Sequence, residues 1–595
     1  MVFSGLTRAL ISSGTFSAAL ATADRDADFS LTPGLNAPML VAMMRERTRT
    51  GESPALLAVT ATSRETESLR DALRALEPTA LLLEFPAWET LPHERLSPSA
   101  EITGRRFDTL RHVAQWDGTT PLIVLASVRA VLQPIAGNLL AVEPLALKRG
   151  SRGNDLDSIS RQLVNLAYSR VDIVTRRGEF AVRGGILDVF SPTAEHPVRL
   201  DFFGDELETV RAFSVADQRS LEGEVDEVVL PPSRELLLTD AVRQRAREME
   251  HEFPAMAGML SKIGEGIAVE GMESLTPALV DKLVPLTEYL PRNVAIAIVA
   301  PERVATRAVN LGETNREFLD AAWNAASVGA TAPIDLSSGD FLTLTQVRSD
   351  YAHGPWWTLS PFDRGDDDDV RVEGEAVPSF AGNVDGAIEH VGEKLRAGWS
   401  VVIASAGHGL VERAEQMLAE HTLAGRIVDA LPDTLETGVA YLVQANLEHG
   451  FELPGASLAL LTESEFYGRS ATYDPRGAKR LAGKRSKNVV DPMQLQKGDI
   501  VVHETHGIGR FLELVSREVS SGGRTPIKTT REYLVIEYAP SKRGFPGDKL
   551  YVPTDQLDQL TRYVGGEEPS LSKMGGSDWS SAKSKARRAV RDIAV

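Results

Sequence analysis

The residue patterns that carry nucleotide chemistry are incomplete in this chain. A phosphate-binding loop needs G-x-x-x-x-G-K-[S/T], in which the glycines let the backbone approach the phosphates, the Lys contacts them and the hydroxyl holds magnesium. The nearest stretches are TPGLNAPML at 32–40, which has no Lys, and AGKR at 482–485, which lacks the spaced glycine and the hydroxyl. We therefore expect no bound nucleotide.

Metal and nucleophile chemistry are not predicted either. HETH at 503–506 places two histidines three residues apart, whereas a zinc helix needs H-E-x-x-H, and the following Gly-Ile-Gly predicts a turn. The chain has no cysteine, which excludes disulfides and thiolate ligands and suits a reducing cytoplasm. No Ser/His/Asp set or spaced pair of carboxylates stands out. The sequence predicts binding domains with no catalytic residue and no metal ligand.

One stretch points to binding instead. RGGILDVFSPTAEHPVRLDFFGDE at 183–206 reads as two strands joined by a short loop. Side chains alternate between the faces of a strand, so Phe202 lies with the apolar set and Phe203 with Arg199 and Asp201. Phe203 is then either a corner residue packed on a neighbouring domain, a consequence of a bend in register, or an exposed anchor for a partner. Arg183, just before Gly-Gly, would share the same face in a hairpin.

Composition bounds the remaining possibilities. A chain of 595 residues exceeds what one core supports, so several domains are expected. The net charge of −19 argues against a surface that coats nucleic acid. The first residues predict a helix and not a signal peptide. The sequence contains no run of 18 apolar residues, so no membrane-spanning helix is predicted. We expect a cytoplasmic protein that does not contact membranes.

The predicted fold class is α/β multidomain. Strand-like runs such as 55–61 and 121–127 alternate with helical patterns, the signature of a parallel sheet, and 293–304 returns to that rhythm after a strand-rich interval. The final helix has no stop signal, so further chain is expected to follow. The predicted segments are an α/β domain at 1–145 that continues at 236–360, a small α+β insert at 146–235, an acidic solvated linker at 361–377, a second α/β domain at 378–490, a small all-β barrel at 491–566 and a connector helix at 567–595.

Three blocks resemble one protein family. Residues 176–220 resemble the segment shared by the excision-repair protein UvrB and the bacterial transcription-repair coupling factors, and residues 85–106 resemble the coupling factors where UvrB differs. Residues 497–566 (KGDIVVHETHGIGRF to TRYVGG) resemble the polymerase-interacting barrel of the coupling factors, which is of the Tudor/CarD-like type. The chain is thus similar to the N-terminal half of a coupling factor, with a UvrB-like first domain.

The resemblance implies partners and site residues. It assigns UvrA binding to Arg183, Arg199 and Phe203. It assigns binding of the RNA polymerase β subunit to strand 532–538 through an open edge, with Leu534 and Ile536 on one face and Tyr533 and Val535 between them. ATP, Mg²⁺ and DNA would be bound by a translocase half outside this chain, so no cofactor is expected here.

Two other hypotheses are compatible with the sequence: a nucleotide-dependent UvrB-like enzyme fragment, and a CarD-like transcription regulator. The sequence assigns no role to the second α/β domain or to the loops at 519–530 and 541–548. It does not predict the oligomeric state, or whether the UvrA surface is masked.

Overall fold

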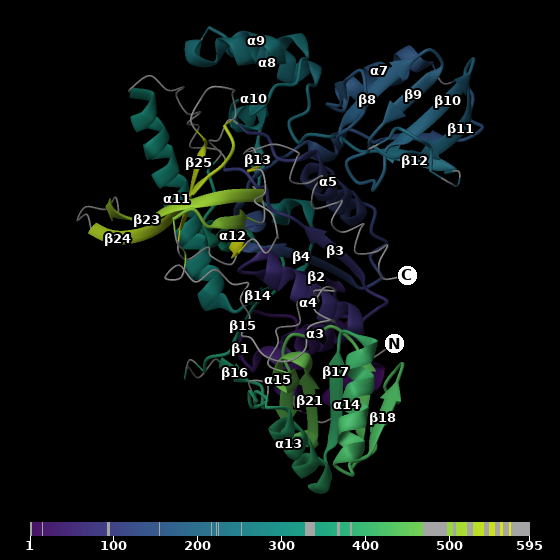
Figure 1. Ribbon diagram of the computed structural model, residues 1–595, viewed down its shortest axis with the longest axis vertical. Helices are drawn as coiled ribbons and strands as arrows, with labels where there is room; N and C mark the ends of the chain where they lie inside the picture. Colours follow the sequence, from purple (N-terminus) through teal and green to yellow (C-terminus); the bar gives the residue numbers. More distant parts are fainter. Residues whose placement is uncertain are drawn as a thin grey trace. The chain divides into compact units, whose positions relative to one another are not determined.

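The structure is a computed structural model that divides into two units, Met1–Tyr473 and Asp474–Val595 (Figure 1). No helix of the described part of the chain is long and apolar enough to cross a bilayer. The described residues are 3–12, 14, 16–91, 96–153, 155–215, 217–221, 223, 225–251, 253–327, 340–363, 365, 369–380, 383–467, 495, 497–503, 507–520, 528–540, 547–553, 560–562 and 571–572.

A seven-stranded parallel sheet forms the centre of the first domain, with strand order β16-β1-β15-β14-β2-β4-β3. Strands β14 and β15 follow the insert in sequence but lie between β1 and β2, so the prediction that the first sheet resumes after the insert is confirmed. The strands are β1 (Ala27–Ser30), β2 (Ala55–Thr60), β3 (Leu81–Phe85), β4 (Leu122–Ser127), β14 (Ala295–Val299), β15 (Trp356–Ser360) and β16 (Asp369–Arg371).

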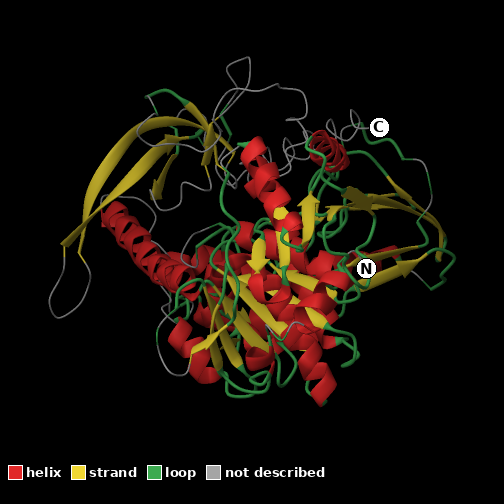
Figure 2. Cartoon of the chain, turned by 90° about the horizontal axis from the view of Figure 1, so that it is seen from below, coloured by secondary structure: helices red, strands yellow, loops and turns green. Residues whose placement is uncertain are grey.

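Helices cover both faces of this sheet (Figure 2). Leu56 and Ala58 of β2 belong to a core shared with α3 and α4, whereas Leu57 and Val59 belong to a core shared with α5, α6 and α11. Strands covered on both faces are apolar throughout, which is why β2 has no polar alternation. The helices are α1 (Ser4–Ser12), α2 (Ser17–Leu20), α3 (Asn36–Thr50), α4 (Ser63–Leu76), α5 (Ala100–Ala114), α6 (Val128–Leu132), α11 (Pro301–Ser327) and α12 (Leu344–Asp350).

The chain between β4 and β14 builds a five-stranded sheet of order β11-β10-β9-β8-β7, two small antiparallel pairs, β12-β6 and β13-β5, and a group of helices. One face of the five-stranded sheet packs on α7 (Figure 1). The elements are β5 (Ile135–Ala136), β6 (Leu145–Lys148), α7 (Leu156–Asn165), β7 (Ser169–Arg170), β8 (Glu179–Arg183), β9 (Ile186–Val189), β10 (Val198–Phe203), β11 (Glu206–Ala212), β12 (Glu227–Leu230), α8 (Asp240–Met249), α9 (Ala257–Glu265), α10 (Thr276–Leu279) and β13 (Leu283–Val284).

The predicted acidic linker is ordered in part, and the expectation of a wholly solvated connection is wrong. Asp369–Arg371 forms β16, which pairs parallel with β1 at the edge of the first sheet. Val372 is buried, and Glu375 bridges to Glu452 of the second α/β domain. The run of aspartates hid a short strand, because backbone pairing at a sheet edge tolerates charged side chains that face water.

The second α/β domain has a five-stranded sheet of order β18-β19-β17-β21-β20, in which β20 alone runs antiparallel to its neighbour. Its helices α13, α14 and α15 pack on one face around Val391, Val411 and Leu418. The elements are α13 (Val384–Arg396), β17 (Ser400–Ser405), α14 (His408–Glu420), β18 (Gly425–Val428), β19 (Ala440–Gln444), β20 (Phe451–Leu453), β21 (Leu458–Thr462) and α15 (Glu463–Tyr467).

The first and second α/β domains share one hydrophobic core. Phe3 and Leu6 of the N-terminal segment lie in the same buried cluster as Tyr441 and Phe451 of the second domain. Gly34, in the stretch that superficially resembles a phosphate loop, lies against the backbone of Gly450, where a Cβ would stand 2.2 Å from the carbonyl oxygen. The glycine of that stretch therefore serves close packing between two domains.

Gly34→Ala is expected to lower the free energy of unfolding by about 1–3 kcal/mol, because the added methyl meets a backbone carbonyl that cannot turn aside. The matched control is Gly409→Ala in α14, where a Cβ meets nothing within 4 Å. Alanine there should stabilise by up to about 1 kcal/mol. Urea denaturation of the two variants beside the parent measures both; equal midpoints for Gly34→Ala and the parent would disprove the close packing.

The second unit is a small antiparallel sheet of order β25-β24-β23-β22-β26. Its core contains Val501, Phe511, Leu534, Ile536 and Val552. The strands are β22 (Ile500–His503), β23 (Gly507–Ser520), β24 (Lys528–Glu537), β25 (Lys549–Pro553) and β26 (Leu560–Arg562). The loop expected at 519–530 is shorter than predicted, because its ends extend β23 and β24. The basic patch at 476–488, the loop tip at 541–546 and the connector at 573–595 lie outside the described residues.

Candidate protein-binding surface

One face of the insert sheet packs on its main core; the other, called here the wet face, is covered in part by a small core that includes Ala181 and Phe213 and is otherwise open to solvent. Leu187, Leu200 and Val210 pair across β9, β10 and β11 and face the core beneath α7. The neighbouring rows, Asp188 with Arg199 and Ile186 with Asp201, therefore point to the opposite side. The alternation predicted for 198–203 is present, with Val198 and Leu200 buried and Arg199 and Asp201 half-buried.

Phe203 stands out on the wet face. The residue is 81% exposed, so the alternative in which it packs on a neighbouring domain does not hold in the described part of the chain. A register shift between Asp201 and Phe202 sets the hairpin end: Phe202 pairs with the fully buried Leu207, and Phe203 pairs with Glu206. The extra residue, Glu208, lies on β11, so the alternation along β10 is kept and Phe203 stays on the face opposite Phe202. Gly204 then turns the chain at a φ of +65°, which glycine adopts without strain.

The hairpin tip that presents Phe203 is fixed from its flank. Arg152 pairs with Glu206 at 2.9 Å, and the Gly153 amide donates to the Asp205 carboxylate at 3.2 Å. Backbone bonds join Leu207 to Ser151 and Gly150 to Leu207. An exposed aromatic ring on a fixed backbone loses little freedom on binding, which favours it as an anchor.

Arg183 shares this face but not the expected strand. The two strands at 183–206 do form an antiparallel pair, β9 and β10, but Arg183 closes β8, so β9 lies between it and β10. Cross-strand pairing places it in one row with Ile186 and Asp201. Its guanidinium is exposed and donates to the carbonyl oxygen of Asp172.

Arg199 is held within the protein. Its Nε and Nη2 donate to the two carboxylate oxygens of Asp188 at 2.7 and 2.8 Å, and its guanidinium lies 5.0 Å from the centre of the Phe213 ring. The bond with Asp188 raises the pKa of the guanidinium above its usual range. The side chain of Asp188 is 5% exposed and that of Arg199 is 24% exposed. Of the three predicted UvrA residues, the structure therefore exposes Arg183 and Phe203 and partly encloses Arg199.

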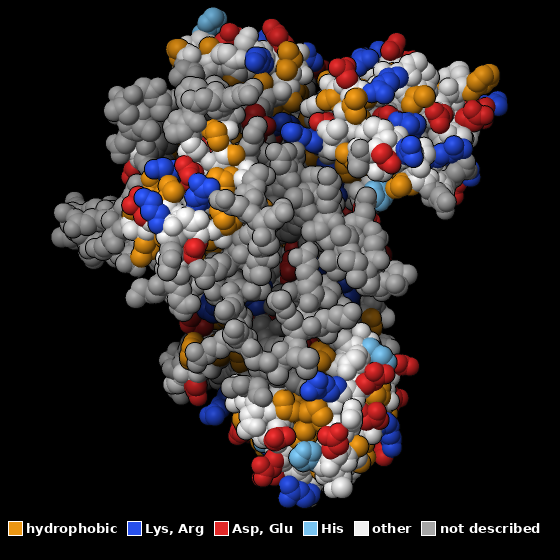
Figure 3. All heavy atoms as spheres, in the orientation of Figure 1, with side chains coloured by type: hydrophobic (Ala, Val, Ile, Leu, Met, Phe, Trp, Pro, Cys, Tyr) orange, Lys and Arg blue, Asp and Glu red, His pale blue; other side chains and the backbone are white. Residues whose placement is uncertain are grey.

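Two further apolar side chains lie on the surface of the insert. Ile186 is 36% exposed and lies in the same cross-strand row as Arg183. Ile173 is 52% exposed and follows Asp172, whose carbonyl oxygen accepts a hydrogen bond from Arg183. In the space-filling view, hydrophobic side chains lie among Lys, Arg, Asp and Glu on the visible face of the insert (Figure 3). The sequence analysis did not predict a role for either isoleucine, although the alternation in β9 places Ile186 on the other face of the strand from Leu187.

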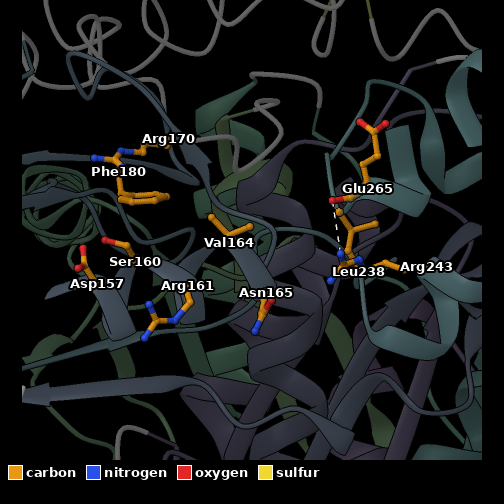
Figure 4. A pocket seen from close by; sticks show the side chains of 11 residues that line it. Asp157, Ser160, Arg161, Val164, Asn165, Arg170, Phe180, Leu238, Arg243 and Glu265 are labelled. Atoms are coloured by element: carbon orange, nitrogen blue, oxygen red, sulfur yellow. Dashed lines mark hydrogen bonds between the residues drawn. The ribbon is translucent and has the colours of Figure 1, made fainter. Parts of the chain in front are cut away.

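A cavity of about 490 Å³ lies on the other side of the insert, between α7 and the α8–α9 helices. Arg161, Arg170 and Arg243 line it together with Asp157 and Glu265. The close view shows the three guanidinium groups at separate parts of the rim (Figure 4). Because charges of both signs line this cavity and the guanidinium groups do not converge on one point, its lining does not indicate a particular ligand.

The place where α/β proteins hold phosphate is occupied by the chain itself. Helix α4 follows β2, and the N-terminus of such a helix attracts anions. Here the Glu65 carboxylate accepts hydrogen bonds from the amides of Ala61 at 3.0 Å and Thr62 at 3.3 Å, and it also pairs with Arg303. Thr62 and Glu65 form a capping box, so the amides of Ala61, Thr62 and Glu65 are already hydrogen-bonded and a carboxylate lies where a phosphate would bind.

The predicted polymerase strand is not at an edge. Residues 533–537 of β24 pair with β23 on one side and with β25 on the other, so the expectation of an open edge there is wrong. Tyr533, Leu534, Val535 and Ile536 are all buried. Sequence alternation cannot tell an edge strand from a central one when both faces are covered. His503 of the HETH stretch is a buried strand residue, and no group of metal-binding side chains occurs among the residues that the structure describes.

Comparison with known proteins defines the class of both regions. Residues 145–236 match the UvrB interaction domain, and residues 495–564 match the CarD-like/TRCF RID domain. The insert that carries Phe203 lies within the first match, and the five-stranded sheet of the second unit lies within the second.

Curated relatives match the chain over almost its whole length. The chain is 43% identical over 619 residues to the transcription-repair-coupling factors of Mycobacterium bovis and Mycobacterium tuberculosis, covering 99% of this chain and 48% of each relative. It is 27% identical to that of Bacillus subtilis, over 89% of this chain and 45% of the relative. The chain spans about half the length of the curated relatives it matches. Its resemblance to the N-terminal half of the transcription-repair-coupling factors is confirmed.

Proposed function

We propose that this chain is the adaptor half of a transcription-repair-coupling factor, which binds stalled RNA polymerase and recruits UvrA for transcription-coupled nucleotide excision repair. The observation that carries the proposal is the 81%-exposed Phe203 on a fixed hairpin, inside the region that matches the UvrB interaction domain. Exposed aromatic rings beside arginine are typical of binding hot spots, because they bury much area at little cost in side-chain freedom.

The RNA polymerase β subunit is the partner proposed for the second unit, on the match of 495–564 to the CarD-like/TRCF RID domain. Pairing with a strand of the polymerase needs an outer strand of the sheet, and the outer strands are β25 and β26. We favour β25, because Lys549–Pro553 offers five residues, against three in Leu560–Arg562. The buried residues of β24 would then support the binding strand without contacting the polymerase.

The whole protein is proposed to be an ATP-dependent DNA translocase, with ATP, Mg²⁺ and DNA bound outside this chain. The match over 99% of this chain to coupling factors supports that assignment over a stand-alone CarD-like regulator. The occupied N-terminus of α4 supports a first domain that does not use nucleotide.

ATP is therefore expected to leave the chain unchanged. With Mg²⁺ and ATP at millimolar concentration, we expect no shift of the melting temperature and no phosphate release, because Glu65 already occupies the amides of Ala61 and Thr62. Differential scanning fluorimetry and a phosphate-release assay measure the two. A saturable rise in melting temperature would favour the UvrB-like enzyme instead.

Binding measurements test the adaptor proposal itself. The chain is immobilised, and UvrA and RNA polymerase are titrated separately over it. Saturable binding of both supports the adaptor role, and binding of neither rejects it.

A further inference from the structure

Arg199 is fixed by its own protein on several sides. The Nε–Nη2 edge of its guanidinium donates to both oxygens of Asp188, so this edge cannot bind a partner's carboxylate at two points. Its Nη1 lies 3.5 Å from the carbonyl oxygen of Gln218, and its Cζ lies 5.0 Å from the centre of the Phe213 ring. Such an arrangement holds neighbouring segments in place.

The contacts continue from Gln218 to the loop at 171–176. The Gln218 side-chain amide donates to the carbonyl oxygens of Val215 at 3.0 Å and Val174 at 3.3 Å. Val174 is fully buried in a small core with Ala181, Phe190 and Phe213. Arg199 thus connects to this loop through Gln218 and Phe213.

The far side of the same loop holds the exposed groups. Asp172 receives the guanidinium of Arg183 on its carbonyl oxygen, and Ile173 is the next residue. Ile186 pairs across the strands with Arg183, and Phe203 follows two residues after Asp201, the partner of Ile186 on β10. Ile173, Arg183, Ile186 and Phe203 are therefore brought to one exposed region, which we call the contact row.

We propose that Arg199 is a positioning residue that holds the contact row in place, and that Ile173 and Ile186 join Arg183 and Phe203 in contacting UvrA. This proposal rests on the proposed function. The partner surface that fits is an apolar hollow for Phe203 and the two isoleucines, with a carboxylate beside it for Arg183.

Asp188→Ala, Arg199→Ala and the double variant separate positioning from contact. If Arg199 holds the contact row in place, each single variant lowers the affinity for UvrA about tenfold. The double variant then lowers the affinity no further, because all three variants break the same Asp188–Arg199 pair. If Arg199 contacts UvrA directly, Asp188→Ala keeps the parent affinity, because the guanidinium remains. Parent affinity for Asp188→Ala overturns the proposal.

Two measurements guard against simple unfolding. Amide exchange should speed up at 171–176 in Asp188→Ala and Arg199→Ala while β8–β10 stay protected, whereas a merely unfolded insert exchanges throughout. Gln218→Ala removes the link to Val174 and leaves the Asp188–Arg199 pair intact, so it should weaken UvrA binding severalfold. Unchanged affinity for Gln218→Ala also overturns the proposal.

The isoleucines are tested singly. Ile173→Ala and Ile186→Ala should each weaken UvrA binding about three- to tenfold. Val164→Ala is the matched control, because Val164 is 39% exposed on α7, which covers the opposite face of the sheet; it should bind as the parent does. Parent affinity for both isoleucine variants would remove them from the contact row. If Phe203→Ala also binds UvrA as the parent does, the proposed function of this surface is wrong. If Phe203→Ala weakens binding and neither isoleucine variant does, only the proposed contacts of Ile173 and Ile186 with UvrA are wrong.

Discussion

Phe203→Ala is expected to weaken binding of UvrA at least about 30-fold, the equivalent of about 2 kcal/mol, as for an aromatic hot spot. The melting temperature should stay within about 1 °C of the parent, because an exposed side chain far from the core contributes little to stability. Phe203 is 81% exposed, whereas its neighbour Phe202 packs against the core cluster that contains Leu207. Titration calorimetry and thermal unfolding on the same samples measure both quantities.

Phe202→Ala is the control within the same dipeptide. It removes a ring that packs against the insert core, so it should lower stability by about 1–3 kcal/mol through lost packing. The opposite pattern, with stability lost in Phe203→Ala and kept in Phe202→Ala, would mean that Phe203 and not Phe202 packs on the insert core.

Leu534→Arg is expected to abolish polymerase binding by unfolding the second unit. Leu534 is fully buried between Leu514 of β23 and Val552 of β25, and a charge there has no partner. We expect a loss of at least about 4 kcal/mol, which exceeds what a small sheet can bear. Circular dichroism and polymerase binding measure the two effects, and binding of UvrA should be unchanged.

Leu534→Met provides the matched control, because it conserves volume and apolar character and should cost less than about 1.5 kcal/mol. A folded Leu534→Arg variant that has lost polymerase binding would mean that Leu534 contacts the polymerase directly, as the sequence first suggested. A folded variant that still binds would remove this strand from both roles.

The helices and strands that could be predicted from the sequence are those in which the spacing of apolar residues shows which side is buried. The strand at 55–60 and the helix at 63–76 were readable because apolar spacing distinguishes a strand from an amphipathic helix. The exposed position of Phe203 followed from period-2 alternation, since the register shift after Asp201 lies on the β11 side and leaves the alternation of β10 intact.

Features that depend on distant partners were not readable. Strand β24 is central because β25, which follows it along the chain, folds back onto its free edge, and nothing within 532–538 indicates that. The enclosure of Arg199 depends on Asp188 one strand away and on Gln218 beyond β11. Strand β16 escaped notice because its pairing with β1 joins residues more than 300 apart in sequence.

Bridging of the two partners tests the central claim most directly. RNA polymerase is immobilised, UvrA is added, and this chain or its Phe203→Ala variant is supplied between them. The adaptor account predicts that UvrA is retained only with the parent chain, and that the variant still binds polymerase but leaves UvrA in solution. If the variant retains UvrA as well as the parent does, or if the parent binds each partner alone but never both, the account of a two-ended adaptor anchored by Phe203 is wrong.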